Sequence, residues 1–289
     1  MTTFTSALIQ FERDAKRHFQ PNTMSTYIIA IKQFFGSHSK SLDEVELQDV
    51  ENWVDGLMGL DKKDSEKEDA KKETTICVKI AALKVFFKYC FGEGFIKKDP
   101  TANVECLKIP ESLPGYFDRV TMFKLREAAK NNIRDRAILE LLYCSGLRVS
   151  EIGNVRLEDI SWKHCEIKVF NSKGFNEGIV MFTAECSHHL KKYLDTRKED
   201  NPYLFVTKWN KPFTRQGLWK LVKGYVKLAG VDKSISPHSF RHSFATNMAE
   251  KNAPFEVIQD FLRVKDPKTA TIYAKLTDQV RKEKYDKYR

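Results

Sequence analysis

Residues 236–244 read Ser-Pro-His-Ser-Phe-Arg-His-Ser-Phe, and this stretch has the features of a helix start. Ser236 is a favoured capping residue, and Pro237 fits the first helical position because the N–H that it lacks would have no helical partner there. Apolar residues then recur every four positions, which places them on one face of a helix. The residues that this spacing directs toward the core are Phe240, Phe244 and Met248.

The first turn of the same helix carries two side chains that suit an anion. His238 and Arg241 are three residues apart, so they share a second face of the helix. Backbone N–H groups without partners and the helix dipole favour negative charge at this end. We therefore predict a phosphate held by Arg241 and His238. The alternatives are a capping or core histidine and a surface ion pair. His242 follows His238 by four residues, a spacing that could also indicate a metal site. No third ligand accompanies the pair, so we expect no metal.

A second turn places another arginine in a defined position. Residues 143–151 read Tyr-Cys-Ser-Gly-Leu-Arg-Val-Ser-Glu. An apolar helix ends at Gly146, and a new helix starts near Ser150, so Arg148 lies in the turn between them. Neighbouring helices hold such an arginine in place, as a phosphate clamp requires. The alternative is an ordinary exposed arginine.

The first hundred residues predict a bundle of helices. Apolar residues at helical spacing give helices at 4–19, 23–36, 41–57 and 74–91, the third opening at Ser41. Four helices with short connections form a compact bundle. Prolines 100, 110 and 114 interrupt any further helix. We predict an N-terminal domain of residues 1–105, a linker of residues 106–116 and a C-terminal domain of residues 117–289.

The C-terminal part predicts helices around a small sheet. Residues 166–170 and 179–182 are strand-like, and the eight residues between them suit a hairpin loop. Further helices are expected at about 119–130, 133–144, 184–198, 214–229, 254–263 and across Tyr273. The predicted fold class is therefore mainly α with a small antiparallel β-sheet.

Charge is distributed unevenly along the chain. Residues 1–110 hold 16 Lys and Arg against 17 Asp and Glu, whereas residues 111–289 hold 33 against 22. A basic C-terminal part suits a polyanion such as DNA or RNA, although a solvated basic surface gives the same count. The six cysteines form no C-x-x-C pair and predict free thiols. No apolar run reaches membrane-spanning length, so we expect no membrane partner.

Three motifs together resemble the tyrosine recombinases, also called the phage integrase family. They are residues 146–151 (Gly-Leu-Arg-Val-Ser-Glu), residues 238–246 (His-Ser-Phe-Arg-His-Ser-Phe-Ala-Thr) and Tyr273, which follows Arg241 by 32 residues. The resemblance extends over nearly the whole chain and is greatest to compact Xer-like and transposon-encoded recombinases. It implies an N-terminal helical, SAM-like core-binding bundle and a C-terminal domain that breaks and rejoins DNA.

The resemblance also implies a role for single residues. Arg148 and Arg241 resemble the arginines that clamp the scissile phosphate, and Tyr273 resembles the nucleophile that forms a 3′-phosphotyrosyl link. Lys173 resembles the hairpin lysine that protonates the leaving 5′ oxygen, and His238 resembles the histidine that assists proton transfer. The covalent link conserves the phosphodiester energy, so no cofactor is expected, neither ATP nor Mg²⁺.

One position departs from the family pattern. The family usually has Leu-Gly-His, sometimes ending in Trp, where this chain has Leu262-Arg263-Val264, nine residues before the tyrosine. The valine side chain cannot donate a hydrogen bond to a phosphate. Either the contact is dispensable, or Arg263 or Lys265 replaces it, and we favour Lys265.

The expected partner is double-stranded DNA with an inverted-repeat core site, bound by a homotetramer on paired sites, with accessory proteins as an option. Lys79, Lys84 and Lys88 are candidate phosphate contacts on the fourth helix, or solvated lysines. A cytoplasmic, nucleoid-associated enzyme of a mobile element or replicon is implied, acting in integration or resolution. Two rivals remain: a type IB topoisomerase-like enzyme, and a catalytically inactive DNA-binding regulator.

Overall fold

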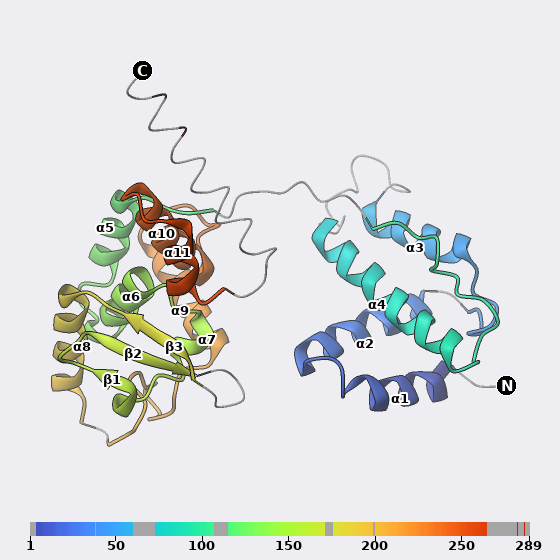
Figure 1. The fold of residues 1–289 in the computed structure, drawn as a ribbon, viewed down its shortest axis with the longest axis horizontal. Coiled ribbons are helices and arrows are strands. Elements are labelled where there is room, and N and C mark those ends of the chain that lie inside the picture. The colour runs from blue at the N-terminus through green and yellow to red at the C-terminus, as the bar shows by residue number, and fades with distance from the viewer. Residues whose placement is uncertain are drawn as a thin grey trace. The chain divides into compact units, whose positions relative to one another are not determined.

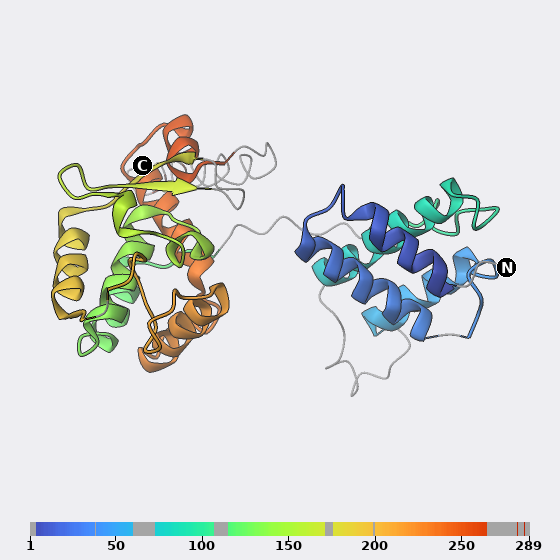
Figure 2. The same cartoon turned by 90° about the horizontal axis from the view of Figure 1, so that it is seen from below.

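The chain forms two compact units, Met1–Glu111 and Ser112–Arg289, in a computed structural model (Figures 1 and 2). The structure describes residues 4–37, 39–59, 73–106, 115–170, 176–198 and 200–264, together with residues 282 and 286. The boundary between the units falls within the predicted linker of residues 106–116. The two units are described one at a time below.

The described part of the N-terminal unit contains four helices around an aromatic core. They are α1 (Phe4–Ala15), α2 (Pro21–Gly36), α3 (Leu47–Met58) and α4 (Glu73–Gly92). α4 packs against the other three helices. Phe11, Phe34 and Phe86 are each at most 1% exposed, and Phe11 meets Phe86 edge to face with ring centroids 5.4 Å apart. The predicted bundle therefore follows from large aromatic residues on the inner faces of these helices.

The third helix begins later than predicted. The Ser41 N–H and hydroxyl both donate to the Glu44 carboxylate, at 3.0 and 2.7 Å, and these contacts close a turn rather than a helix. The helix begins at Leu47 after a second cap, in which the Glu46 N–H donates to Asp49 Oδ2 at 2.8 Å. Ser41 with Glu44 and Glu46 with Asp49 both have the pattern of a helix cap. The predicted helix start at Ser41 is wrong, because the second cap begins the helix.

The C-terminal unit is mainly helical with one small antiparallel sheet, as predicted. Its α-helices are α5 (Arg119–Ala128), α6 (Ile133–Ser145), α7 (Val149–Ile152), α8 (Ala184–Thr196), α9 (Arg215–Leu228), α10 (Pro237–Glu250) and α11 (Phe255–Leu262). The sheet consists of β1 (Ile160–Ser161), β2 (Glu166–Phe170) and β3 (Asn176–Met181), in that order. The sheet lies along one side of the unit, beside α6 and α8 (Figures 1 and 2).

The hairpin of β2 and β3 confirms the two predicted strands but shifts one boundary. Ile167 pairs with Val180, and both side chains are fully buried. β3 begins at Asn176, three residues before the predicted start, because backbone pairing continues to Phe170 past the apolar run. β1 was not predicted, since two residues are too short to show an alternating pattern.

Helix α6 is the centre of the C-terminal core. Ile138, Leu139, Leu141 and Leu142 are all 0% exposed, because α8, α10 and α5 pack around this helix. It ends at Gly146, which has a φ of 63°. This left-handed conformation turns the chain sharply toward α7, and glycine adopts it without steric cost.

Helix α10 is buried on more sides than its predicted apolar face. Phe240 is 0% exposed and meets Phe117 edge to face at 4.8 Å, as expected for a core residue. Phe244 and Met248, expected on the same face, are only partly buried. Polar residues of the helix are buried instead, among them Arg241 and His242. Neighbouring elements thus enclose the helix, and their backbone groups supply partners for its polar side chains.

A substitution at Gly146 tests how strictly this turn is constrained. An added Cβ would lie 2.7 Å from a ring carbon of Phe244, in a conformation that disfavours L residues. We expect Gly146→Ala to lower the free energy of unfolding by about 2 to 4 kcal/mol in urea titrations. Gly224→Ala on α9 is the control, because no atom lies within 4 Å of its added Cβ. Its free energy of unfolding should rise by about 0.5 to 1 kcal/mol. Equal effects at both sites would contradict the account.

Candidate functional site

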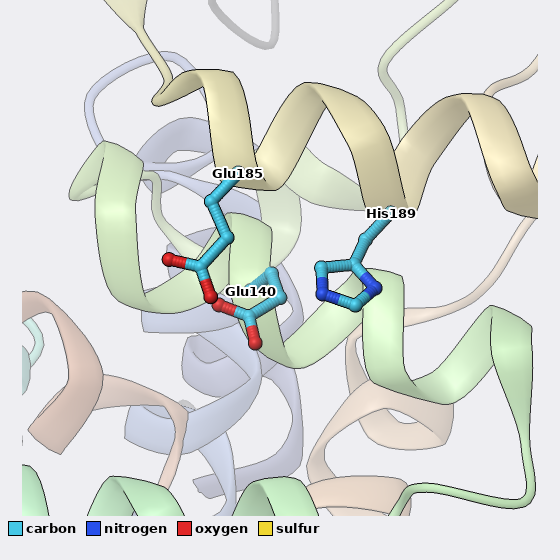
Figure 3. Close-up of side chains that lie close together, drawn as sticks. All are labelled: Glu140, Glu185 and His189. Atoms are coloured by element: carbon cyan, nitrogen blue, oxygen red, sulfur yellow. The ribbon is translucent and has the colours of Figure 1, made fainter.

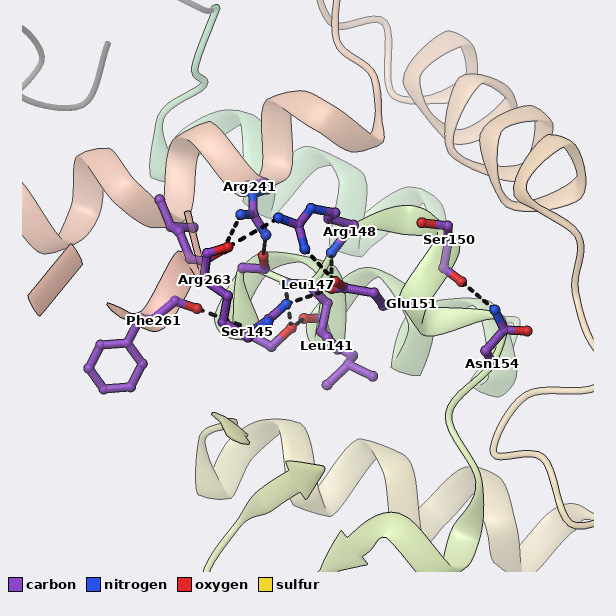
Figure 4. Close-up of polar contacts among 12 residues, drawn as sticks. Leu141, Ser145, Leu147, Arg148, Ser150, Glu151, Asn154, Arg241, Phe261 and Arg263 are labelled. Carbon is purple, nitrogen blue, oxygen red and sulfur yellow. Dashed lines mark hydrogen bonds and ion pairs between the residues drawn. The ribbon is translucent and has the colours of Figure 1, made fainter. Parts of the chain in front are cut away.

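Arg241 is a buried arginine held by two backbone carbonyl groups. It lies in the first half of α10 and is 4% exposed. Its Nη1 donates to the Gly146 carbonyl oxygen at 2.6 Å, and its Nη2 donates to the Leu262 carbonyl oxygen. These bonds join α10 to the turn after α6 and to the end of α11 (Figure 4). The carbonyl groups at a helix C-terminus carry partial negative charge, which suits a guanidinium.

Arg148 lies beside Arg241 and is more accessible. It caps α7, and its backbone N–H donates to Glu151 Oε2 at 2.7 Å. Its Nη1 pairs with Glu151 Oε1 at 2.7 Å, and its Nη2 donates to the Arg263 carbonyl oxygen at 3.3 Å. The Arg148 side chain is nevertheless 41% exposed. Both predicted clamp arginines therefore contact the end of α11, and Figure 4 shows their side chains converging there.

His238 lies in the first turn of α10, with its ring packed on one side and its remaining surface exposed. Its ring meets that of His242 edge to face, with centroids 4.3 Å apart. Partial burial lowers the pKa of His238, and the nearby charges of Arg241 and Arg148 lower it further, with a contribution from Arg215. A lowered pKa makes the imidazole neutral near pH 7 and thus able to accept a proton. The structure therefore brings together three of the predicted residues, namely Arg148, His238 and Arg241.

The position that departs from the family pattern is described as far as Val264. Val264 packs against an apolar cluster that includes Ala245 and Leu262. The Arg263 side chain is 5% exposed and pairs with Glu151 at 2.6 Å. Its guanidinium is therefore both enclosed and paired with a carboxylate, whereas the equally enclosed Arg241 donates to uncharged carbonyl groups. Because its charge is paired with Glu151, Arg263 does not present it to an incoming phosphate, so a dispensable contact and a replacement by Lys265 stay as the two alternatives.

Three predicted site residues lie outside the described residues: Lys173, Lys265 and Tyr273. Lys173 falls in sequence between β2 and β3, and Tyr273 follows the end of α11. Their roles stay predictions.

The candidate DNA-binding lysines of α4 do not form one stripe. Lys79 and Lys84 are five residues apart, which corresponds to ~140° around a helix, whereas Lys84 and Lys88 differ by only ~40°. Lys79 Nζ donates to Gln33 Oε1 at 2.6 Å and lies 5.4 Å from the centre of the Trp53 ring. Lys79 thus has partners inside its own unit, whereas Lys88 is exposed.

The sequence analysis missed two residues that act on the predicted site, Glu151 and Arg215. Glu151 was quoted only as part of a motif, yet its carboxylate bonds both Arg148 and Arg263. Arg215 begins α9 and is close enough to affect His238. A signal for Arg215 was available, because Thr214 is a favoured cap and basic residues follow on the same helix.

One group of side chains in the described residues has the composition of a metal site. Ligand atoms of Glu140, Glu185 and His189 lie within 4.8 Å of one another, and Figure 3 shows the two α8 residues pointing toward Glu140 on α6. Both oxygens of Glu140 are already bonded, to Arg126 at 2.6 Å and to Arg136 at 2.7 Å. Arg126 also lies 3.6 Å from Glu185. The group is an ion-pair network, because two guanidinium charges occupy the place of a cation.

Two further observations concern the molecule as a whole. The six cysteines, which all lie among the described residues, form no disulfide bond. Within the described residues, no helix combines the length and the apolar content that a membrane crossing requires.

Comparison with known proteins gives a consistent result. Residues 118–280 match the phage integrase family. The chain is 30% identical over 288 residues to the tyrosine recombinase XerD of Oceanobacillus iheyensis, covering 94% of each protein. It is 36% identical over 230 residues to the tyrosine recombinase XerC of Thermodesulfovibrio yellowstonii, covering 75% of this chain and 76% of XerC.

Solved structures agree in fold. The crystal structure of XerA recombinase is 27% identical, covers 99% of this chain and 98% of its own, and has a TM-score of 0.56. A lambda integrase tetramer bound to a Holliday junction is 18% identical, covers 94% of this chain and 77% of its own, and has a TM-score of 0.76. At that identity, the second likeness concerns the fold alone.

The buried His242 predicts a pH-dependent stability. Burial and the neighbouring His238 and Arg241 lower its pKa to about 3 in the folded chain, whereas an unfolded histidine titrates near ~6.5. Between these values the unfolded state binds more protons, so stability is present above pH ~6.5 and is lost as the pH falls. The free energy of unfolding should fall by at most ~1.4 kcal/mol per pH unit from this group.

Urea titrations from pH 7 to pH 4.5 measure this slope. His242→Asn should flatten it relative to the parent, and His188→Asn, which changes an exposed histidine on α8, is the matched control. A slope that His242→Asn leaves unchanged would disprove the assignment.

Proposed function

The chain belongs to the phage integrase family and is a site-specific DNA recombinase, and we propose that it cleaves DNA through Tyr273 with Arg148 and Arg241 holding the scissile phosphate. Strand cleavage and rejoining is the reaction, and the relatives named above are tyrosine recombinases. The rival functions, a relaxing topoisomerase and an inactive regulator, find no support among these relatives.

The observation that carries the proposal is the convergence of two guanidinium groups at the end of α11. Arg241 is fixed by carbonyl groups on two sides, and Arg148 is fixed by Glu151 while its side chain stays 41% exposed. A phosphoryl transfer gathers negative charge on the equatorial oxygens of phosphorus. Two pre-oriented guanidinium groups stabilise that charge without reorganisation and without a metal ion.

The chemical step then follows from the resemblance and from the state of His238. The Tyr273 oxygen forms a bond to phosphorus while the bond from phosphorus to the 5′ oxygen breaks. A phenol with a pKa of ~10 needs a base, and the lowered pKa of His238 makes it a neutral acceptor for the proton. Lys173 gives a proton to the leaving 5′ oxygen. The product is a 3′-phosphotyrosyl link and a free 5′ hydroxyl, and rejoining reverses each transfer without ATP or Mg²⁺.

The assembly that we propose is a homotetramer on two inverted-repeat core sites. A lambda integrase tetramer has been solved on a Holliday junction, which supports strand exchange in pairs for a chain of the same fold. The N-terminal unit would contact DNA through residues such as Lys84 and Lys88. We also propose that the enzyme acts at the nucleoid in the cytoplasm, because DNA is its substrate, and that it serves a mobile element or replicon.

The covalent intermediate tests the proposal directly. Parent protein incubated with nicked suicide DNA of the native flanking sequence should give a covalent protein–DNA band on a denaturing gel. Tyr273→Phe should abolish the band, because the ring without its hydroxyl has no nucleophile. Tyr285→Phe is the matched control and should retain the parent's yield. A band that persists in Tyr273→Phe would assign the nucleophile to another residue.

Lys265 is proposed to supply the phosphate contact that Val264 cannot make. Loss of one charged donor to a transition state costs on the order of 100-fold in rate, so Lys265→Ala should slow single-turnover cleavage to about that extent. Lys282→Ala, at a position further along the chain, controls for a general loss of positive charge. Cleavage by Lys265→Ala at the parent's rate would show that the contact is dispensable.

A further inference from the structure

Arg263 occupies a backbone position that suits glycine. It ends α11 with φ 52° and ψ 50°, and its N–H donates to the carbonyl groups of Asp260 and Gln259. This left-handed conformation costs free energy for any residue with a Cβ, and helices commonly place glycine there. A conformation of this kind persists where the surrounding structure holds it in place. The contacts of the Arg263 side chain are therefore what holds this conformation in place.

The Arg263 side chain is enclosed by three elements. Its Nη2 pairs with Glu151 Oε2 at 2.6 Å, across 112 residues of sequence. Its Nη1 donates to the Phe261 carbonyl oxygen at 3.3 Å. On β3, a Cβ added to Gly178 would lie 3.1 Å from Arg263 Cδ, so the glycine leaves room for this side chain. The side chain is 5% exposed and acts on its neighbours rather than on a ligand.

Glu151 divides its carboxylate between two arginines. Oε1 accepts from Arg148 Nη1 at 2.7 Å, whereas Oε2 accepts from the Arg148 backbone N–H at 2.7 Å and from Arg263 Nη2 at 2.6 Å. The Glu151 side chain is 9% exposed. One negative charge is thus shared between two positive charges, and Figure 4 shows the three side chains side by side.

We propose that Arg263 is a positioning residue for strand cleavage, which holds one oxygen of Glu151 and so keeps Arg148 aligned and available for the scissile phosphate. The inference rests on the proposed function. Without Arg263, Glu151 Oε2 keeps only the Arg148 backbone N–H as a partner, and the carboxylate can form a two-toothed pair with the Arg148 guanidinium. That pair turns the guanidinium away from the phosphate and cancels its charge. Residues that orient a charged group without touching the substrate can change the reaction rate strongly.

The contacts of the Arg263 backbone strengthen the same link. Its carbonyl oxygen accepts from Arg148 Nη2 at 3.3 Å, and the preceding carbonyl, that of Leu262, accepts from Arg241. The end of α11 therefore positions both clamp arginines through its backbone, and Arg148 also through the Arg263 side chain. A change limited to the Arg263 side chain leaves these carbonyl groups in place, which allows the two contributions to be separated.

Arg263→Gly is the variant of choice, because glycine fits the left-handed backbone and removes only the side chain. Single-turnover cleavage is measured on two suicide DNAs, one with a normal scissile phosphate and one with a methylphosphonate, in which a neutral methyl group replaces a charged oxygen. On the phosphate we expect a loss on the order of 10- to 100-fold. On the methylphosphonate, which has less charge to stabilise, the loss should be below about threefold. Arg263→Lys keeps the charge and should recover part of the rate.

A double-mutant cycle with Glu151→Gln provides the second measurement. The amide keeps the shape of the carboxylate and removes the charge that Arg263 neutralises. In that background Arg263→Gly should change the cleavage rate by less than about twofold, because the two residues act as one unit. Additive effects of the two changes would overturn the inference.

Three other outcomes decide the matter. Cleavage of the normal phosphate by Arg263→Gly at the parent's rate would overturn the inference. An equal loss on both DNAs would also overturn it, because a merely structural role affects both substrates alike. If parent protein itself formed no covalent product on its native site, the proposed function would fail, and this inference would fail with it.

Discussion

The buried guanidinium of Arg241 is the interaction on which the site depends. A charge that is 4% exposed must have hydrogen-bond acceptors, and the carbonyl groups of Gly146 and Leu262 supply them from two different segments. This requirement ties α10 to the turn after α6 and to the end of α11. The left-handed turn at Gly146 and the end of α11 beyond Leu262 are thus constrained together, and both belong to the proposed phosphate clamp.

The two arginines of the proposed clamp differ in how far they are exposed, which suits the task that we propose for them. Arg241 is enclosed and fixed, whereas Arg148 is held from behind by Glu151 and exposes 41% of its side chain. An enclosed charge fixes the position of an anion, and an exposed one remains accessible to it. His238 lies in the same field, which lowers its pKa and favours the neutral form. A neutral base beside two cations is the combination that a phenol nucleophile needs.

The sequence predicted the local parts of this arrangement well. The capped start of α10, the turn at Gly146 and the hairpin of β2 and β3 each depend on residues close together in the chain. The predicted set Arg148, His238 and Arg241 is brought together in the structure. The pairing of Arg263 with Glu151 could not be predicted, because 112 residues separate them and tertiary packing selects the partner. Tertiary packing also explains why α10 is buried beyond its apolar face. The start of α3 was misplaced for a local reason, because two capping patterns follow each other at Ser41 and Glu46.

The covalent intermediate itself offers the most direct measurement of the central claim. Adduct from the parent protein and a suicide DNA is digested with protease and nuclease, and the modified peptide is located by mass spectrometry. We expect a nucleotide attached through its 3′ phosphate to Tyr273, with a 5′ hydroxyl on the released strand. A nucleotide attached to any other residue, or through a 5′ phosphate, would contradict it.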